Sequence, residues 1–188
     1  MNIATDKQAI RREMRQRRRD FVAQRSGQLW TLTEDHFGDL LDSGVSLASY
    51  HAYGDEADPA PIVALARSYQ AMTAWPRVDG DGLMRFYSLG PSRSLDVDSA
   101  GMVAPGKDAC PAQPDIILLP LVAFDRIGTR LGQGGGHYDR ALAALDAQGH
   151  RPIRIGIAWS AQEHPGLPRD PWDMRLDHII TEQEWITP

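Results

Sequence analysis

The sequence is poor in cysteine and has no long apolar run. Cys110 is the only cysteine, so no disulfide forms within these residues and a metal site of clustered cysteines is excluded. No stretch approaches the ~20 apolar residues that a membrane-spanning helix needs. The segment from Met1 to Lys7 lacks the apolar core and cleavage site of a secretory signal. We therefore expect a cytoplasmic protein without a membrane segment.

Lysine is also scarce, and positive charge is concentrated near the start. Lys7 and Lys107 are the only lysines, and seven arginines crowd one segment: Arg11, Arg12, Arg15, Arg17, Arg18, Arg19 and Arg25. The net charge of −5 nevertheless argues against a general nucleic-acid binder. With 188 residues, 42% of them hydrophobic, and no repeat or low-complexity linker, the chain is expected to form one domain over residues 1–188.

Segments typical of strands alternate with segments typical of helices. We predict helices over 6–25, 29–41 and 138–147, and a further helix that begins at Pro59. The first helix is expected to place its arginines on the solvent-exposed face. Strands are expected over 45–53, 72–75 (ended by Pro76), 83–89, 116–119, 153–159 and 178–181. The continuous apolar run Ile116–Leu119 is typical of a strand buried on both faces. The pattern predicts a three-layer α/β domain with a mainly parallel central sheet.

A glycine-rich stretch, FDRIGTRLGQGGGHYDR over 124–140, carries the strongest functional signal. Five glycines within nine residues allow successive backbone N–H groups to form an anion-binding nest, and the helix that follows offers its unpaired amides. Arg130 supplies a cationic fork for phosphate, and Asp139 supplies an oxygen ligand for magnesium. The motif is not a Walker loop, because His137-Tyr138 stands where that loop has Lys-Ser/Thr. The glycine content alone is also compatible with a flexible surface loop. We expect a phosphate-binding loop at the carboxyl ends of the strands.

The motif D-x-x-G-x-R-L-G-x-G-x-G, followed by an aromatic-like residue and Tyr-Asp, resembles the signature of 5-formyltetrahydrofolate cyclo-ligases. Other segments resemble the same family in the same order: Lys7 and Arg11 as K-x-x-x-R, GDEAD over 54–58, WPR over 75–77, GMVAP over 101–105, Leu167-Pro168, and LDHIITE over 176–182. Two positions depart from the family. His137 replaces the first of two tyrosines, and no aromatic residue stands near Ala100.

The resemblance implies an ATP-dependent enzyme that uses Mg²⁺ and closes 5-formyltetrahydrofolate to 5,10-methenyltetrahydrofolate by phosphorylating the formyl oxygen. It assigns catalysis to Arg130 and Lys7. It assigns ATP binding to Lys7, Arg11, Arg130, Leu131, Gly132, Gln133, Gly134, Gly135, Gly136, His137 and Tyr138. It assigns folate binding to His51, Glu56, Gln133, Gly136 and His137, and metal binding to Asp139 and Asp173, with Asp177 as the competitor of Asp173. Small-molecule partners only are expected, and a monomer is favoured.

Two other functions remain open at this point. The first is a related ATP-using enzyme with a different acceptor, which would keep the glycine loop, Arg130 and Asp139 without using Glu56 for a pterin. The second is a non-catalytic nucleotide- or RNA-binding protein that uses the basic first helix and binds with steep salt dependence. If these residues bind no ligand, Glu56 is a surface carboxylate and Asp139 is an acidic residue in the first turn of a helix, where the helix dipole favours it.

Overall fold

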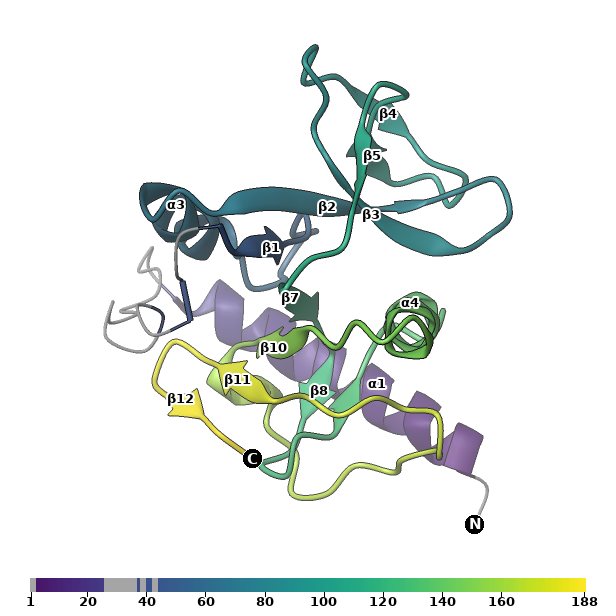
Figure 1. Cartoon of the computed structure of the whole chain (residues 1–188). Coiled ribbons are helices and arrows are strands. Elements are labelled where there is room, and N and C mark those ends of the chain that lie inside the picture. The colour runs from purple at the N-terminus through teal and green to yellow at the C-terminus, as the bar shows by residue number, and fades with distance from the viewer. Residues whose placement is uncertain (1–2, 26–36, 38–39, 42–43) are drawn as a thin grey trace.

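The computed structural model describes residues 3–25, 37, 40–41 and 44–188, so most of the predicted helix over 29–41 lies outside the described residues (Figure 1). The helices are α1 (Ile3–Ala23), α3 (Ala60–Ser68), α4 (His137–Ala147) and the short 3-10 helix η1 (Ser160–Gln162). The strands are β1 (Ser46–Ala48), β2 (Met72–Val78), β3 (Met84–Ser88), β4 (Leu95–Val97), β5 (Val103–Pro105), β6 (Cys110–Ala112), β7 (Ile116–Pro120), β8 (Ala123–Phe124), β9 (Arg130–Leu131), β10 (Ile153–Ile157), β11 (His178–Ile180) and β12 (Trp185–Ile186). No helix in this described part is both long and apolar enough to cross a bilayer.

An eight-stranded sheet occupies the centre of the molecule, in the order β12-β11-β10-β7-β1-β2-β3-β6 (Figure 1). The five inner strands from β11 to β2 are parallel to their neighbours, whereas β12, β3 and β6 join antiparallel at the two sides. The mainly parallel sheet is therefore confirmed. The antiparallel additions were only partly predicted, since β6 and β12 are too short to give a clear periodicity.

The apolar run of β7 serves both faces of this sheet. Ile116 and Leu118 belong to a cluster that includes α3 and the end of α1, whereas Ile117 and Leu119 belong to a cluster that includes α4. All four side chains are at most 1% exposed. A strand covered on both faces needs helices on both sides, so the predicted three-layer arrangement is confirmed.

Strand β2 continues through Pro76, where the sequence predicted its end. The pairing of β1 with β2 stops at the pair Ala48–Ala74, whereas β2 runs on beside β3 as far as the pair Val78–Met84. A proline disrupts a sheet mainly by removing a ladder hydrogen bond. Beyond the end of β1 there is no parallel neighbour on that side, so Pro76 is tolerated within the strand.

One face of α1 is buried, and it includes charged residues. Lys7, Arg11, Met14 and Arg18 are spaced four, three and four residues apart, which places them on the same side of a helix. Met14 is fully buried against Val122, Ala123 and Leu131 of the β8–β9 region. The sequence placed the arginines of this helix in water, but Arg18 is only 5% exposed.

Arg18 is buried because it forms an ion pair with the loop after β1. Its Nε and Nη2 atoms donate to the two carboxylate oxygens of Asp55 at 3.1 and 2.9 Å. Burial alone would raise the pKa of Asp55, but the hydrogen bonds and charge of Arg18 outweigh it and hold that pKa below its ordinary value of 3.8. The pair fixes the loop that carries the adjacent Glu56.

Replacing Asp55 with asparagine should lower the free energy of unfolding by about 1–3 kcal/mol at neutral pH, because Arg18 loses its counter-charge and one acceptor. A depressed carboxyl pKa contributes stability above its unfolded value, and this contribution is lost as the pH falls through the folded-state pKa. The difference between variant and wild type should therefore shrink below about pH 4. Urea unfolding across this range measures it. Asp96→Asn, on exposed β4, is the control, and a difference independent of pH would contradict the prediction.

Candidate active site

One cavity of about 890 Å³ contains every site residue predicted from the sequence. Its volume is near the upper end of the ~300–1,000 Å³ typical of ligand pockets, which leaves room for two small molecules side by side. The predicted residues on its lining are Lys7, Arg11, His51, Glu56, Arg130, Leu131, Gly132, Gln133, Gly134, Gly135, Gly136, His137, Tyr138, Asp139 and Asp173. They come from α1, the loop after β1, β9, the glycine loop, α4 and the loop before β11.

A small hairpin positions Arg130 at this cavity. The sequence predicted a loop from residue 124 onwards, but β8 and β9 pair there, with Phe124 opposite Arg130. Asp125 closes the turn, since its Oδ1 accepts hydrogen bonds from the backbone N–H groups of Ile127 and Thr129 at 3.2 and 2.8 Å. The first half of the glycine-rich motif therefore forms a turn, and only its second half is the loop.

Arg130 is a buried cation with an unused donor. Its side chain is 4% exposed, and Nη2 donates to Oδ1 of Asp139 at 2.6 Å. The guanidinium carbon lies 5.8 Å from the centre of the Tyr138 ring. Its Nε is buried and has no hydrogen-bond partner among the described residues. A buried donor without a partner costs about 1–3 kcal/mol, so this atom favours an anionic ligand beside Arg130.

The glycine loop over 132–136 lies against α1. Arg11 Nε donates to the carbonyl of Gly132 at 2.8 Å, and a Cβ atom at Gly134 would come within 3.5 Å of the Arg11 guanidinium. Gly134 and Gly136 have φ values of +112° and +64°, which side chains with a Cβ rarely adopt. Gly136 also directly precedes α4. The loop thus delivers its backbone to the N-terminus of a helix, an arrangement suited to anions.

Lys7 is held by two aspartates of the loop before β11. Its Nζ donates to Asp170 at 2.8 Å and also to Asp173 Oδ2, and its side chain is 9% exposed. Burial alone would lower the pKa of Lys7, but both carboxylates outweigh it and raise the pKa above its ordinary 10.5. Lys7 is therefore a fixed positive charge over the working pH range.

The two predicted metal ligands lie on adjoining walls. Asp139 Oδ1 accepts a hydrogen bond from the backbone N–H of Met174 at 3.2 Å. Because Met174 follows Asp173 in the chain, this bond places Asp173 close to Asp139. Asp177 instead accepts from the backbone N–H of Arg154 at 2.8 Å and is not part of the cavity lining. Of the two alternatives, the geometry favours Asp173.

The donor set fits magnesium only in company with phosphate. The described residues contain no cluster of three or more His, Cys, Asp or Glu side chains that would hold a metal unaided. Magnesium keeps several waters and needs only one or two carboxylates beside substrate phosphates. Within the described structure, Oδ2 of Asp139 and Oδ1 of Asp173 accept no hydrogen bond, so each residue has one oxygen to offer.

The predicted folate residues form a second polar group in the same cavity. Glu56 accepts from the side-chain amide of Gln133 at 3.0 Å and from the backbone N–H of Tyr53 at 3.1 Å. His51 stacks on Trp75, with ring centres 6.3 Å apart. The Glu56–Gln133 bond joins the loop after β1 to the glycine loop, so the two predicted ligand sites adjoin.

An apolar wall faces these polar groups. It is made by Pro76 and Val78 of β2, Met84 of β3, and Met102 and Val103 at the β4–β5 hairpin. Met102 and Val103 are 53% and 55% exposed although they line the cavity. Such a wall suits a flat aromatic ligand, because a bound ring would remove this surface from water.

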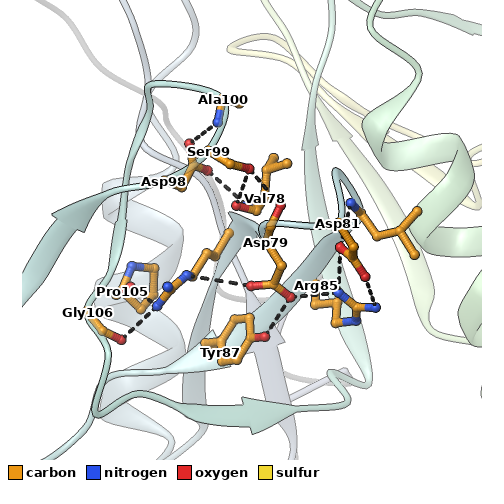
Figure 2. A network of polar contacts seen from close by, with 12 residues as sticks. Val78, Asp79, Asp81, Arg85, Tyr87, Asp98, Ser99, Ala100, Pro105 and Gly106 are labelled. Carbon is orange, nitrogen blue, oxygen red and sulfur yellow. Dashed lines mark hydrogen bonds and ion pairs between the residues drawn. The ribbon is translucent and has the colours of Figure 1, made fainter.

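Hydrogen bonds tie the β4–β5 hairpin to β2 (Figure 2). The carboxylate of Asp98 accepts from the backbone N–H groups of Val78 and Ala100, each at 2.9 Å. It also accepts from the backbone N–H of Met102 at 2.9 Å. Arg77 Nη1 donates to the backbone carbonyls of Pro105 and Gly106, each at 3.1 Å. The hairpin is held at its turn and at its base, which fixes the apolar wall.

Sequence reasoning missed several cavity residues. Asp170 shares Lys7 with Asp173, Arg140 and Ala143 come from α4, and Trp172 is 69% exposed at the lining. The run DPWD over 170–173 was a usable signal for Asp170, since it repeats an acid within four residues. The spacing of residues in the sequence does not indicate that Arg140 and Trp172 line the cavity.

The fold and the cavity define a three-layer α/β protein whose cavity combines a cationic glycine loop with an apolar wall. A family model described as the 5-formyltetrahydrofolate cyclo-ligase family matches residues 3–182. The chain belongs to this family.

Individual relatives agree with this assignment. The chain is 46% identical over 66 residues to a 5-formyltetrahydrofolate cyclo-ligase of Haemophilus influenzae and 33% identical over 111 residues to that of Escherichia coli K12. These matches cover 35% and 55% of this chain, and 34% and 60% of the relatives' lengths, so each spans less than two thirds of the relative. The solved structure of Aquifex aeolicus 5,10-methenyltetrahydrofolate synthetase superposes with a TM-score of 0.70 at 26% identity, covering 96% of this chain and 92% of that one.

Proposed function

We propose that the protein catalyses the ATP- and Mg²⁺-dependent cyclisation of 5-formyltetrahydrofolate to 5,10-methenyltetrahydrofolate, with release of ADP and phosphate. The observation that carries this proposal is one cavity of about 890 Å³ in which a cationic glycine loop adjoins a carboxylate and an apolar wall. A reaction between a nucleotide and a pterin needs both environments in contact.

The chemistry follows from the poor reactivity of a formamide. The formyl oxygen attacks the terminal phosphorus of ATP, and ADP leaves. The resulting iminium phosphate is electrophilic at carbon, so N10 of the folate attacks it and gives up its proton to water. The C–O bond then breaks, phosphate leaves with the bonding electrons, and the five-membered ring is closed.

Positioning and charge stabilisation supply most of the catalysis in such a transfer. We assign Arg130, the glycine-loop amides and Lys7 to the phosphates. Arg130 carries the buried donor without a partner, and Lys7 stays charged at neutral pH. No side chain need act as a covalent nucleophile.

Asp139 and Asp173 would hold the magnesium ion, through the oxygen that each leaves unused. When bound, the metal neutralises charge on the transferred phosphoryl group. Arg11 holds the loop in place through Gly132, and its guanidinium is the next cation available to phosphate.

The decisive assay is incubation with 5-formyltetrahydrofolate, ATP and Mg²⁺, monitored by the ultraviolet absorption of the methenyl product. One ADP should appear per methenyl group. ATP use with other acceptors but without methenyl formation would favour a related enzyme. Salt-sensitive RNA binding without turnover would favour the binding-protein alternative.

Replacing Glu56 with glutamine should raise the KM for 5-formyltetrahydrofolate about 10- to 100-fold, because a hydrogen bond to a charged group is worth about 1.5–3 kcal/mol. A carboxylate can accept two N–H bonds from the amino-pyrimidinone edge of a pterin, whereas an amide offers one acceptor. The KM for ATP should not change.

Steady-state kinetics with each substrate varied in turn tests this, with Glu13→Gln on the exposed side of α1 as the matched control. If both KM values of Glu56→Gln equal those of the wild type, Glu56 is a surface carboxylate and a different acceptor is favoured.

A further inference from the structure

The cations of the cavity differ in whether they already have partners. Lys7 is paired with Asp170 and Asp173, and Arg130 is paired with Asp139. Arg140 also lines the cavity, yet it forms no ion pair within the described residues. A guanidinium is always charged and presents a fork of donors that matches a carboxylate.

The side chain of Arg140 has one polar contact in the described structure. Its Nη2 lies 3.3 Å from Nδ1 of His137, which is a long hydrogen bond. Its Nη1 lies close to Gly136 at the end of the glycine loop, since a Cβ atom built on Gly136 would come within 2.8 Å of it. The residue is exposed and lines the cavity, and most donors of its guanidinium have no partner within the described residues.

The position of Arg140 on α4 places it beside the apolar wall. Ala143, three residues further on, shares its helix face and lines the cavity with Met84. The α4 helix packs against β3, the strand of Met84. Asp139, four residues before Ala143, borders the same part of the helix, but its carboxylate is engaged by Arg130 and by the loop before β11. Arg140 is therefore the charged residue of this turn whose donors are left for a ligand beside the apolar wall.

The proposed folate substrate has anionic groups that neither the residues assigned to the pterin nor those assigned to the phosphates would bind. 5-Formyltetrahydrofolate ends in a glutamyl group, whose two carboxylates are separated from the pterin by an aromatic ring. If Glu56 holds the pterin and the apolar wall holds the ring, these carboxylates need a cation at the rim. We propose that Arg140 binds the glutamyl carboxylates of the folate substrate. This inference rests on the proposed function.

The test compares two substrates, 5-formyltetrahydrofolate and the primary amide of 5-formyltetrahydropteroate (here the pteroate), which lacks the glutamyl group and carries no carboxylate. Arg140→Ala should raise the KM for the folate about 10- to 100-fold, as expected for a lost charge-assisted contact, and leave the KM for the pteroate unchanged. The KM for ATP should also stay unchanged. Arg140→Lys should be intermediate, because it keeps the charge and loses the fork. Arg151→Ala, in the exposed turn before β10, is the control.

Each other outcome has a definite meaning. An equal rise in both folate and pteroate KM, or a rise in the KM for ATP, would overturn the assignment of Arg140 to the glutamyl group. A variant that equals the wild type on both substrates would overturn it as well. If the wild type forms no methenyl product from either substrate, the proposed function itself fails. Thermal unfolding of each variant checks that the fold is intact, and Arg140→Gln is the substitute if the alanine variant does not fold.

Discussion

Replacing Arg130 with alanine should lower kcat about 100- to 1,000-fold with both substrates saturating, the loss typical of removing one preorganised donor from a developing negative charge. Arg130 is fixed by its 2.6 Å hydrogen bond to Asp139, so it needs no reorganisation when the phosphoryl group transfers. Its buried Nε has no hydrogen-bond partner among the described residues, and a phosphate oxygen beside it would satisfy this donor. Because such a contact strengthens as charge develops, kcat should fall more than KM rises.

A variant at a buried ion pair can also fail by misfolding, so two further proteins are needed. Arg130→Lys keeps the positive charge beside Asp139 and should recover part of the lost rate, and Arg19→Ala on the exposed face of α1 should behave as the wild type. Circular dichroism and thermal unfolding establish that the variants are folded. A folded Arg130→Ala enzyme with the wild-type kcat would remove Arg130 from the catalytic residues.

The parts of the fold that could be predicted are those in which local sequence has one physical solution. The run from Ile116 to Leu119 is typical of a strand buried on both faces, and β7 lies inside the sheet with these side chains buried. Likewise, the glycines before His137 end where α4 begins, because the loop and the helix start are encoded within a few residues.

The β4–β5 hairpin could not be predicted by the same means. Each strand has three residues, which is too short for an alternating pattern to be recognised. The hairpin is stabilised instead by Asp98, whose carboxylate binds backbone groups of its own turn and of β2, twenty residues away. Contacts of this kind depend on the tertiary structure and cannot be predicted from the spacing of residues in the sequence.

The candidate site shows the same division. The motif and the resemblance named many of the residues that line the cavity, but not how they pair with one another. The ion pair of Lys7 with Asp173 joins residues 166 positions apart, and the burial of Arg18 with Asp55 was contrary to expectation. A residue type at a position can be read from a sequence, whereas its counter-ion depends on which segments the fold brings together.

Removing either proposed metal ligand should raise the Mg²⁺ concentration needed for half-maximal turnover. We expect a rise of about tenfold or more for Asp139→Asn and Asp173→Asn, because a magnesium ion held by one or two carboxylates depends strongly on each. Asp177→Asn should leave the Mg²⁺ requirement unchanged, since Asp177 binds the backbone of Arg154 and does not line the cavity.

Asp173 has a second role that the experiment must separate from metal binding, because it also holds Lys7. Asp170→Asn provides the comparison: it weakens the other ion pair of Lys7 and leaves the oxygen of Asp173 in place. Turnover is measured against Mg²⁺ at fixed, saturating ATP and folate, and Mn²⁺ binding to each variant with ATP is followed by electron paramagnetic resonance. If Asp173 is a ligand, Asp173→Asn shifts the Mg²⁺ requirement and weakens Mn²⁺ binding, whereas Asp170→Asn alters the KM for ATP without shifting the metal requirement. Equal shifts in the Asp170 and Asp173 variants would mean that both act only by positioning Lys7, and the metal would then be held by Asp139 with the phosphates and water.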